Sequence, residues 1–380
     1  MLRFLTAGES HGPALSAIVE GMPAGVPITE EIINHDLARR QVGYGRGGRM
    51  QIERDSARLL AGVRFGSTLG SPISLLIENR DWANWTEKMR QDAPSAEYVP
   101  PITTPRPGHA DLAGMKKYGT NDLRNILERA SARETAARVA VGAIARCLLR
   151  ELGITVFSHV LRIGSVLAQP DLSDLLGLAA AAEASDLRCA DSTAAAKMRS
   201  LIDEAKAAGD TLGGVFQVVV TGLPVGLGSH VHWDRRLDGI LASAVLSIPA
   251  IKGVEFGMGF GVAELPGSLV HDAMYPSTAG ITRTTNNAGG LEGGMTNGEP
   301  LLLQAAMKPI PTLVKPLPSV DLATGEAVAA HAERSDVCAV AAAGVVAEAM
   351  VAFTLAAQII AQYGGDQLAE IISRVEVAQK

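Results

Sequence analysis

The sequence has little cysteine, few aromatic residues and no surplus of basic charge. Its three cysteines, Cys147, Cys189 and Cys338, are widely spaced and form no CxxC pair. This spacing argues against a disulfide framework and a structural zinc site, and it is typical of proteins from a reducing compartment. A net charge of −6 and an aromatic fraction of 4% disfavour a nucleic-acid partner, because such binding needs a broad basic face and rings that stack on bases.

The sequence also shows no secretory signal, since the opening MLRFLTAGESHG has no apolar core of the necessary length. The most apolar run, residues 337–360, contains Glu348 and Gln358 and is rich in alanine. A carboxylate in the middle of a bilayer is costly, so this run predicts a buried helix rather than a membrane span. We therefore expect a cytoplasmic protein with no membrane partner and no metal site.

Apolar residues make up 47% of the chain, which is enough for a large packed core, and 40 glycines indicate many tight turns. Short β-like runs that end at Gly or Pro predict strands at residues 16–20, 74–78, 215–221 and 301–305. Helical periodicity predicts helices at residues 121–152, 192–208 and 336–363. The proline-rich residues 89–108 should form an irregular loop, and residues 168–212 should form a peripheral insertion.

Two pairs of segments resemble each other. GVRFGSTLGSPISL at 62–75 matches GLEGGMTNGEPLLL at 290–303, and EGMPAG at 20–25 matches TGLPVG at 221–226. Because the matches occur in the same order, they predict a duplication in which each half pairs its own strands and helices pack between the sheets. Chance similarity among glycine-rich turns is the alternative. We expect residues 1–380 to form a single compact α/β unit.

Two histidines lie in turns that could direct them into a site. His11 stands between glycines in GESHG, where the backbone can approach a ligand closely. His109 follows a Pro-Gly turn in RPGHAD, which fixes where its ring points. A turn with a surface histidine is the alternative, and no Ser/His/Asp order indicates a hydrolase.

Two groups of arginines are candidates for binding anions. Arg40, Arg46 and Arg49 lie in the glycine-rich stretch DLARRQVGYGRGGR, and Arg129 and Arg133 share one face of an expected helix. A guanidinium group binds phosphate or carboxylate through two hydrogen bonds. Neither group matches a P-loop or a Rossmann fingerprint. A solvated charge run and an exposed, salt-bridged helix with Glu134 and Arg138 are the alternatives.

The C-terminal half contains further candidate binding groups, namely backbone N–H groups and one carboxylate. NNAGGLEGG at 286–294 is a glycine-rich turn and is followed by KPIPT at 308–312; backbone N–H groups in such turns bind phosphate or flavin carbonyls. Asp336 precedes the long apolar helix. A plain capping aspartate is the alternative for this residue.

In their order along the chain, these motifs resemble those of the chorismate synthase family. The matching stretches are GESHG (8–12), DLARR (36–40), RPGHAD (106–111), RASARETA (129–136), NAGGLEGG (287–294) and RSDVC (334–338). The likeness covers most of the chain and thins over residues 80–103, 165–205 and the last fifteen residues. Six motifs in one order identify the chain as a member of this family.

The resemblance implies a lyase that converts 5-enolpyruvylshikimate 3-phosphate to chorismate by 1,4-elimination of phosphate and a ring proton, a step in aromatic amino-acid biosynthesis. It implies a need for reduced FMN without net redox change, with NADPH acting only as a reductant of the flavin. It also implies an α+β fold, a β-α-β sandwich with helices between antiparallel sheets and an internal pseudo-twofold duplication, and a homotetramer. Whether a separate flavin reductase is a partner stays open.

The resemblance also implies roles for individual residues. His11 would be the general acid for the leaving phosphate, His109 would lie by the flavin pyrimidine ring, and Asp336 would lie near flavin N5. The flavin contacts would be Arg129, Ala130, Ser131, Ala250, Gly293, Lys308, Pro309, Ile310, Pro311, Thr312 and Arg334. The substrate, or NADPH, would be bound by Arg40, Arg46, Arg49 and Arg133.

Two other classes of function compete with the lyase. A flavin oxidoreductase that transfers hydride is disfavoured by the absence of a Rossmann glycine signature. A non-enzymatic anion- or nucleotide-binding module is disfavoured by the acidic charge and the scarce aromatics.

Overall fold

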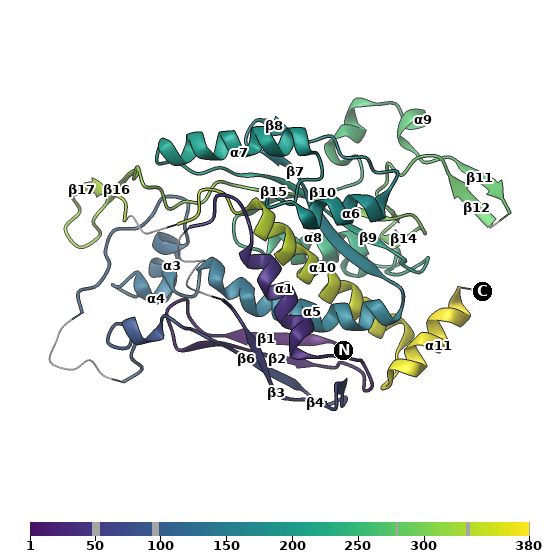
Figure 1. Ribbon diagram of the computed structural model, residues 1–380, viewed down its shortest axis with the longest axis horizontal. Coiled ribbons are helices and arrows are strands. Elements are labelled where there is room, and N and C mark those ends of the chain that lie inside the picture. Colours follow the sequence, from purple (N-terminus) through teal and green to yellow (C-terminus); the bar gives the residue numbers. More distant parts are fainter. Residues whose placement is uncertain (48–53, 93–98, 279, 332–334, 380) are drawn as a thin grey trace.

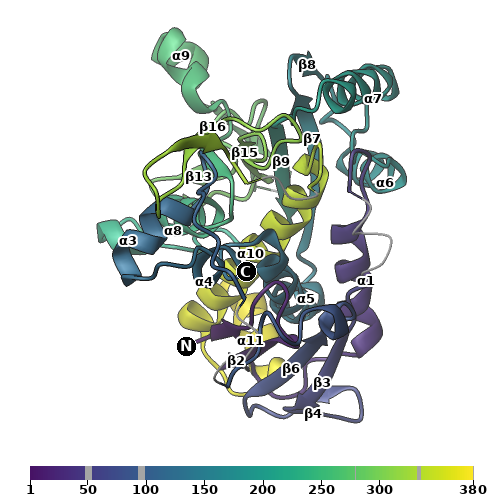
Figure 2. The same ribbon diagram turned by 90° about the vertical axis from the view of Figure 1, so that its left-hand side faces the viewer.

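The computed structural model describes residues 1–47, 54–92, 99–278, 280–331 and 335–379, and it contains two antiparallel sheets with helices between them (Figures 1 and 2). The first sheet has the order β1-β2-β6-β3 and consists of β1 (Arg3–Ala7), β2 (Ala14–Glu20), β3 (Ala57–Ala61) and β6 (Ile73–Glu78). The second has the order β10-β15-β9-β7-β8 and consists of β7 (Thr155–Ile163), β8 (Val166–Leu167), β9 (Gly214–Thr221), β10 (Ile251–Phe256) and β15 (Leu301–Met307). The expected α+β sandwich and all four expected strands are confirmed.

The helices between the sheets are α1 (Glu30–Gln41), α5 (Thr135–Glu151), α8 (Leu237–Leu246) and α10 (Val340–Tyr363). Helices α5 and α10 cross in very close contact, because a Cβ atom on Gly142 would lie only 2.2 Å from the Cβ of Ala349. Glycine is therefore required at this crossing for steric reasons. The surrounding core consists mainly of Ala, Val, Ile and Leu from both sheets and both helices.

The order of the elements repeats between the two halves. In the first half, β1 and β2 are followed by α1, β3, a hairpin of β4 (Val63–Arg64) and β5 (Ser67–Thr68), then β6 and α5. In the second half, the same places are taken by β7, β9, α8, β10, a hairpin of β13 (Leu291–Glu292) and β14 (Met295–Thr296), then β15 and α10. Each half contributes one sheet and one long central helix.

Equivalent threonines in the two hairpins make the same hydrogen bonds. Thr68 Oγ1 donates to the carbonyl of Pro23, and Thr296 Oγ1 donates to the carbonyl of Pro224, both at 2.6 Å. Each hydroxyl also accepts from the backbone N–H three residues after that proline, at 2.9 and 2.8 Å. The sequence match between these turns therefore reflects a shared structure and not a chance abundance of glycine.

The helix expected over residues 121–152 is interrupted. It is divided into α4 (Arg124–Leu127), the 3₁₀ turn η2 (Ala132–Glu134) and α5. Ser131 has an extended backbone, and its Oγ accepts from the N–H of Arg133 at 3.3 Å. Serine favours the position that caps a helix, so it starts a new helix here instead of continuing the old one. The helix expected over 336–363 begins later, at Val340.

The insertion at residues 168–212 contains α6 (Leu175–Ala184), which the sequence analysis did not predict, and α7 (Ser192–Ala207), which it did. The expectation that the insertion is peripheral is wrong in part. Arg188 is buried, and its Nη2 donates to Glu348 of α10 at 3.0 Å. The insertion is thus tied to the central helix by a buried ion pair.

Glu348 is fully buried and joins four parts of the fold. It accepts hydrogen bonds from Arg39 of α1 at 2.8 Å, Arg146 of α5 at 2.9 Å, and Ser158 of β7 at 2.7 Å, besides the bond from Arg188. Burial by itself would raise the pKa of Glu348, but the surrounding arginines lower it on balance. Glu348 therefore stays ionised and links the helices to the second sheet.

By length and composition, α10 could cross a membrane, but 94% of its most apolar 18-residue window is buried inside the structure. The prediction of a buried helix is confirmed. The proline-rich residues 89–108 contain no helix or strand where they are described. The remaining elements are η1 (Trp82–Asn84), α3 (Asp111–Tyr118), η3 (Trp233–Arg235), η4 (Gly259–Glu264), α9 (Gly267–Val270), β11 (Met274–Ser277), β12 (Gly280–Arg283), β16 (Pro318–Val320) and β17 (Ala327–Ala329).

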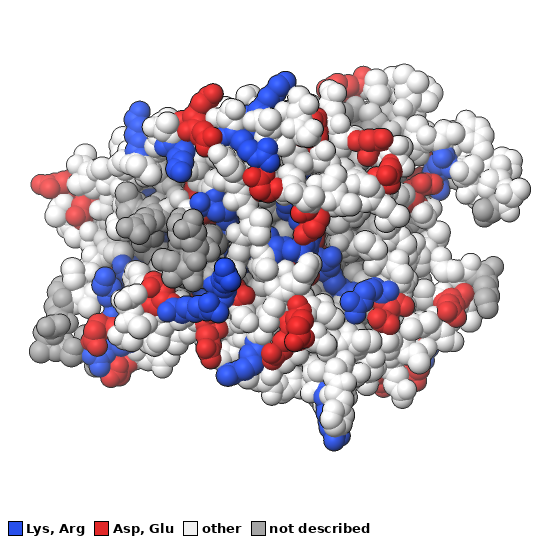
Figure 3. All heavy atoms as spheres, in the orientation of Figure 1, with Lys and Arg blue, Asp and Glu red and all other residues white. Residues whose placement is uncertain are grey.

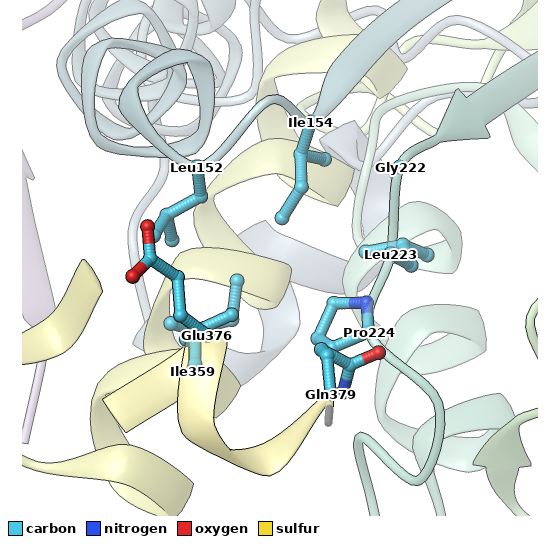
Figure 4. Close-up of a pocket in the computed structure, with 9 residues that line it drawn as sticks. Leu152, Ile154, Gly222, Leu223, Pro224, Ile359, Glu376 and Gln379 are labelled. Carbon is cyan, nitrogen blue, oxygen red and sulfur yellow. The ribbon is translucent and has the colours of Figure 1, made fainter. Parts of the chain in front are cut away.

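The C-terminal helix α11 (Leu368–Ala378) joins equivalent turns of the two halves. Before the helix, the carbonyl of Asp366 accepts from the N–H of Ala24 at 2.8 Å; after it, the side chain of Gln379 accepts from the N–H of Val225 at 3.3 Å. Ala24 and Val225 occupy matching positions in EGMPAG and TGLPVG. Between α11 and the second turn lies an open apolar cavity of about 470 Å³ (Figure 4).

Candidate functional site

The N-termini of the two central helices converge beside the end of α1. Arg40 Nη1 donates to Thr135 Oγ1 at 3.3 Å, at the start of α5. Three residues later, a Cβ on Gly43 would lie 3.9 Å from the Cβ of Ala341, at the start of α10. Helix N-termini carry partial positive charge and N–H groups without intrahelical acceptors. This end of the molecule therefore favours anions.

Arg40 and Arg133 share one carboxylate, that of Asp55. The Asp55 oxygens lie 2.5 Å from Arg40 Nη2 and 2.8 Å from Arg133 Nη1, and the three side chains are at most 5% exposed. One carboxylate between two guanidinium groups orients both and leaves a local positive charge. The structure thus brings these two predicted anion-binding residues together, and it adds Asp55, which the sequence analysis missed.

Arg46 pairs with Asp336 across a 3.0 Å contact, and the N–H of Gly47 donates to the same carboxylate at 2.6 Å. Burial lowers the pKa of Arg46, although Asp336 opposes that effect. The alternative that Asp336 merely caps α10 is wrong, because the capping position is Ala339. Arg40, Arg46 and Arg133 form what we call the arginine cluster, and Asp336, which is 20% exposed, lies at its edge beside Arg46.

His11 is buried in a pocket made by Glu128 and Trp85. Its Nδ1 lies 2.9 Å from Glu128 Oε1, and its backbone N–H donates to Glu128 Oε2 at 2.8 Å. The imidazole stacks on the Trp85 ring with the centroids 3.7 Å apart. The surface-histidine alternative is therefore wrong for His11. Neither Glu128 nor Trp85 was predicted as a site residue.

The interrupted helix brings Ser131 and Arg129 to the GESHG turn. Ser131 Oγ lies 3.1 Å from Ser10 Oγ, and Ala130 lies beside it in the same turn. Arg129 donates to the carbonyls of Gly8 and Thr6, both at 3.0 Å. The guanidinium group thus holds the N-terminal strand in place, and Ser131 faces the segment that carries His11.

His109 belongs to a second group around Asp111. Its Nδ1 contacts the Asp111 carboxylate, which also accepts from Arg106 Nε at 2.9 Å. Arg106 Nη1 reaches Thr312 Oγ1 at 3.2 Å. Burial alone would raise the pKa of Asp111, but its hydrogen bonds to His109 and Arg106 hold it well below its usual range. The carboxylate is therefore an ionised acceptor that orients both side chains.

The KPIPT segment connects this group to Asp336. Lys308 Nζ contacts the carbonyl of Gly108, and the Lys308 N–H donates to the carbonyl of Ala250 at 2.9 Å. At the other end, Ser335 Oγ donates to the carbonyl of Thr312 at 2.8 Å. These contacts place Ala250 and the segment Lys308, Pro309, Ile310, Pro311 and Thr312 together, between His109 and Asp336.

Gly293 lies elsewhere. It belongs to the β13–β14 hairpin, which pairs with the Gly226 turn, and that turn accepts from Gln362 near the end of α10. From Val340 to Gln362, α10 is about 33 Å long at 1.5 Å per residue. The hairpin is therefore at the opposite end of α10 from Asp336 (Figure 1). Within one chain, the structure does not bring Gly293 to the other predicted flavin contacts.

Two predicted site residues, Arg49 and Arg334, lie outside the described residues. In the part of the chain that is described, no group of three or more His, Cys, Asp or Glu side chains could hold a metal ion. On the face drawn in Figure 3, Lys and Arg side chains are interspersed with Asp and Glu. That face has no broad basic patch of the kind that a nucleic-acid polymer requires.

Comparisons with known proteins agree with the motif order. A family model described as chorismate synthase matches residues 2–360. A chorismate synthase of Moorella thermoacetica is 62% identical over 99% of this chain and 97% of its own length, and one of Desulforamulus reducens is 59% identical over 100% and 99%. A crystal structure of a chorismate synthase superposes with a TM-score of 0.80 at 44% identity, covering 100% of this chain and 98% of the other.

Proposed function

The chain belongs to the chorismate synthase family, and from this premise we propose that the arginine cluster, His11 and the two helix N-termini form the site of phosphate elimination. The observation that supports this most directly is the convergence of the α5 and α10 N-termini beside the end of α1, which carries Arg40. The substrate, 5-enolpyruvylshikimate 3-phosphate, carries two carboxylates and one phosphate. Such a ligand needs several cations and N–H donors in one place.

In the proposed reaction, Arg40, Arg46 and Arg133 bind the anionic groups of the substrate. As the carbon–oxygen bond to phosphate breaks, negative charge grows on the leaving group. Fixed cations stabilise that charge more in the transition state than in the bound substrate. A protonated His11 would donate its proton to the leaving phosphate as general acid. Asp336 would help to move the ring proton that is lost.

The residues around His109 fit reduced FMN. Lys308, Arg106 and Thr312 supply cationic and hydroxyl donors for a phosphate or a pyrimidine edge, and Asp111 orients His109 beside them. Ala250, Arg129, Ala130 and Ser131 would complete the flavin contacts. When bound, reduced flavin supplies transient electron density for breaking the carbon–oxygen bond and recovers it afterwards. NADPH would serve only to reduce the flavin.

The position of Gly293 has a consequence for the oligomeric state. Because it lies at the far end of α10 from Asp336, it would reach a flavin only from a second copy of the chain. We therefore propose a homotetramer in which one subunit completes the site of another. We also propose a cytoplasmic location, which agrees with the buried α10 and with three free cysteines.

The proposal is tested by measuring phosphate release from 5-enolpyruvylshikimate 3-phosphate with chemically reduced FMN, under anaerobic conditions and without nicotinamide. We expect turnover by the unmodified protein, whereas His11→Ala should bind flavin normally and lose most of its turnover. An undiminished rate in His11→Ala would refute the assigned role of His11. Dependence of turnover on a nicotinamide even with reduced FMN would favour an oxidoreductase.

A further inference from the structure

We propose that Glu128 is a positioning residue, which holds the His11 imidazole with Nδ1 toward the protein so that Nε2 is the nitrogen left for the substrate. This inference rests on the proposed role of His11. The Glu128 carboxylate contacts both the ring Nδ1, at 2.9 Å, and the backbone N–H of His11, at 2.8 Å. Two contacts from one carboxylate fix the backbone and the ring of the same residue together.

Glu128 is well placed to act as an ionised acceptor. Its side chain is 2% exposed, and Arg124 Nη1 lies 3.1 Å from Oε1. Burial by itself would raise the pKa of Glu128, but the hydrogen bonds and charge of His11 and the charge of Arg124 lower it on balance. An ionised carboxylate only accepts hydrogen bonds, so Nδ1 carries a hydrogen in either protonation state of the ring. Proton exchange with a ligand is therefore left to Nε2.

Trp85 fixes the remaining freedom of the ring. It stacks on the imidazole at an angle of 24°, so the ring cannot rotate away from Glu128 without losing this contact. Arg124 and Lys88 lie 5.3 and 5.2 Å from the Trp85 ring centroid. Among the described residues, the charged side chains close to this pair of rings include Glu128, Arg124 and Lys88.

Backbone contacts hold Glu128 itself in place. Its carbonyl accepts from the N–H of Ser10 at 3.0 Å, and the Ser131 and Ser10 hydroxyls lie 3.1 Å apart. Glu128 is the C-cap residue of α4, which ends at Leu127, and it stands at the start of the interruption between α4 and η2. The break in the helix is what allows a glutamate from this segment to face the GESHG turn.

The test compares Glu128→Gln with Glu183→Gln. The control residue is also a glutamate paired with arginines, Arg39 at 2.9 Å and Arg188 at 2.7 Å, but it belongs to α6 and lies outside the proposed site. We expect Glu128→Gln to lower kcat about 10- to 100-fold, a part of the roughly 10²- to 10⁴-fold that a general acid contributes. KM should change little, and the alkaline limb of the pH–kcat profile should move to lower pH. Glu183→Gln should keep the parent profile.

A double-mutant cycle separates positioning from a general structural effect. In a His11→Ala background, Glu128→Gln should cause no further loss of kcat, because the group that it positions is absent. Equal losses in both backgrounds, or a Glu128→Gln profile equal to that of Glu183→Gln, would overturn the inference. If His11→Ala itself has no effect, it is the proposed function that fails.

A second variant covers the case in which Glu128→Gln does not fold. Glu128→Asp keeps the charge and withdraws it by one methylene, so kcat should fall to an intermediate value with flavin binding retained. A Glu128→Asp protein with the parent kcat and the parent pH profile would also overturn the inference.

Discussion

Replacing Glu348 by glutamine should destabilise the protein by about 3–5 kcal/mol, the usual effect of removing one partner from a buried ion pair. Glu348 is fully buried, and it accepts hydrogen bonds from Arg39, Arg146 and Arg188. Glutamine has nearly the same shape, so no cavity forms. The cost arises because three guanidinium groups keep their positive charges and lose the carboxylate that they share.

The size of the expected shift in melting temperature follows from chain length. Unfolding entropy is about 2.1 cal/mol/K per residue, so for 380 residues each kcal/mol corresponds to roughly 1.2 °C. The expected decrease in Tm is therefore about 4–6 °C. Glu183→Gln is the matched control, because Glu183 pairs with Arg39 and Arg188 but is 45% exposed. Water screens that pair, so its loss should cost about 1 kcal/mol or less.

Lowering the pH should reduce the difference in stability between the parent protein and Glu348→Gln. The pKa of Glu348 is lowered in the folded state, so its contribution to stability is complete above the unfolded pKa of about 4.3 and is lost as the pH falls from that value through the folded pKa. Calorimetry at neutral pH and at several lower pH values measures both effects. A Glu348→Gln protein that melts within 1 °C of the parent at neutral pH would refute the argument, as would a difference that grows in acid.

Two further changes test the helix crossing and the C-terminal helix. Gly142→Ala should lower stability by about 1–3 kcal/mol through overpacking, because the new Cβ would lie 2.2 Å from the Cβ of Ala349. In an uncrowded helix the same substitution usually raises stability. Denaturant unfolding that shows Gly142→Ala to be more stable than the parent would contradict the crossing geometry. Ending the chain after Gly365 removes α11 together with its fully buried Ile371, exposes the apolar surface that Ile371 covers and breaks the contacts to Ala24 and Val225. That truncation should cost about 2–4 kcal/mol, mostly from apolar surface; an unchanged Tm would show that α11 does not join the two halves.

The sequence predicted the strands and the duplication because both depend on local signals. A strand ending at a G-x-P turn and a threonine followed by glycine and proline recur in both halves, and the structure gives the two threonines the same hydrogen bonds. The interruption at Ser131 was also a local signal. Serine is a strong capping residue, and Glu134 three positions later completes a capping-box pattern that the helical periodicity of the segment concealed.

The roles of Glu128 and Asp55 could not be predicted from local sequence signals. Glu128 meets His11 across 117 positions of sequence, and Asp55 meets Arg133 across 78. In the sequence, Glu128 looks like an ordinary helical glutamate with Arg124 four residues before it. Only the folded chain shows that its carboxylate faces a histidine instead of water.

The duplication also bears on where we propose the site, at one end of the central helices. Helices α5 and α10 occupy equivalent places in the two halves and cross at Gly142, with both N-termini beside the end of α1. A twofold relation therefore places two positive helix ends together, which favours a strongly anionic substrate. The side chains there are not duplicated: α5 is preceded by Arg133, and α10 is preceded by Asp336. A pair of identical halves would offer only a symmetric anion site. In the function that we propose, a cation near one helix end and a carboxylate near the other would give the site a side that binds anions and a side that can accept a proton, as elimination of phosphate and a ring proton requires.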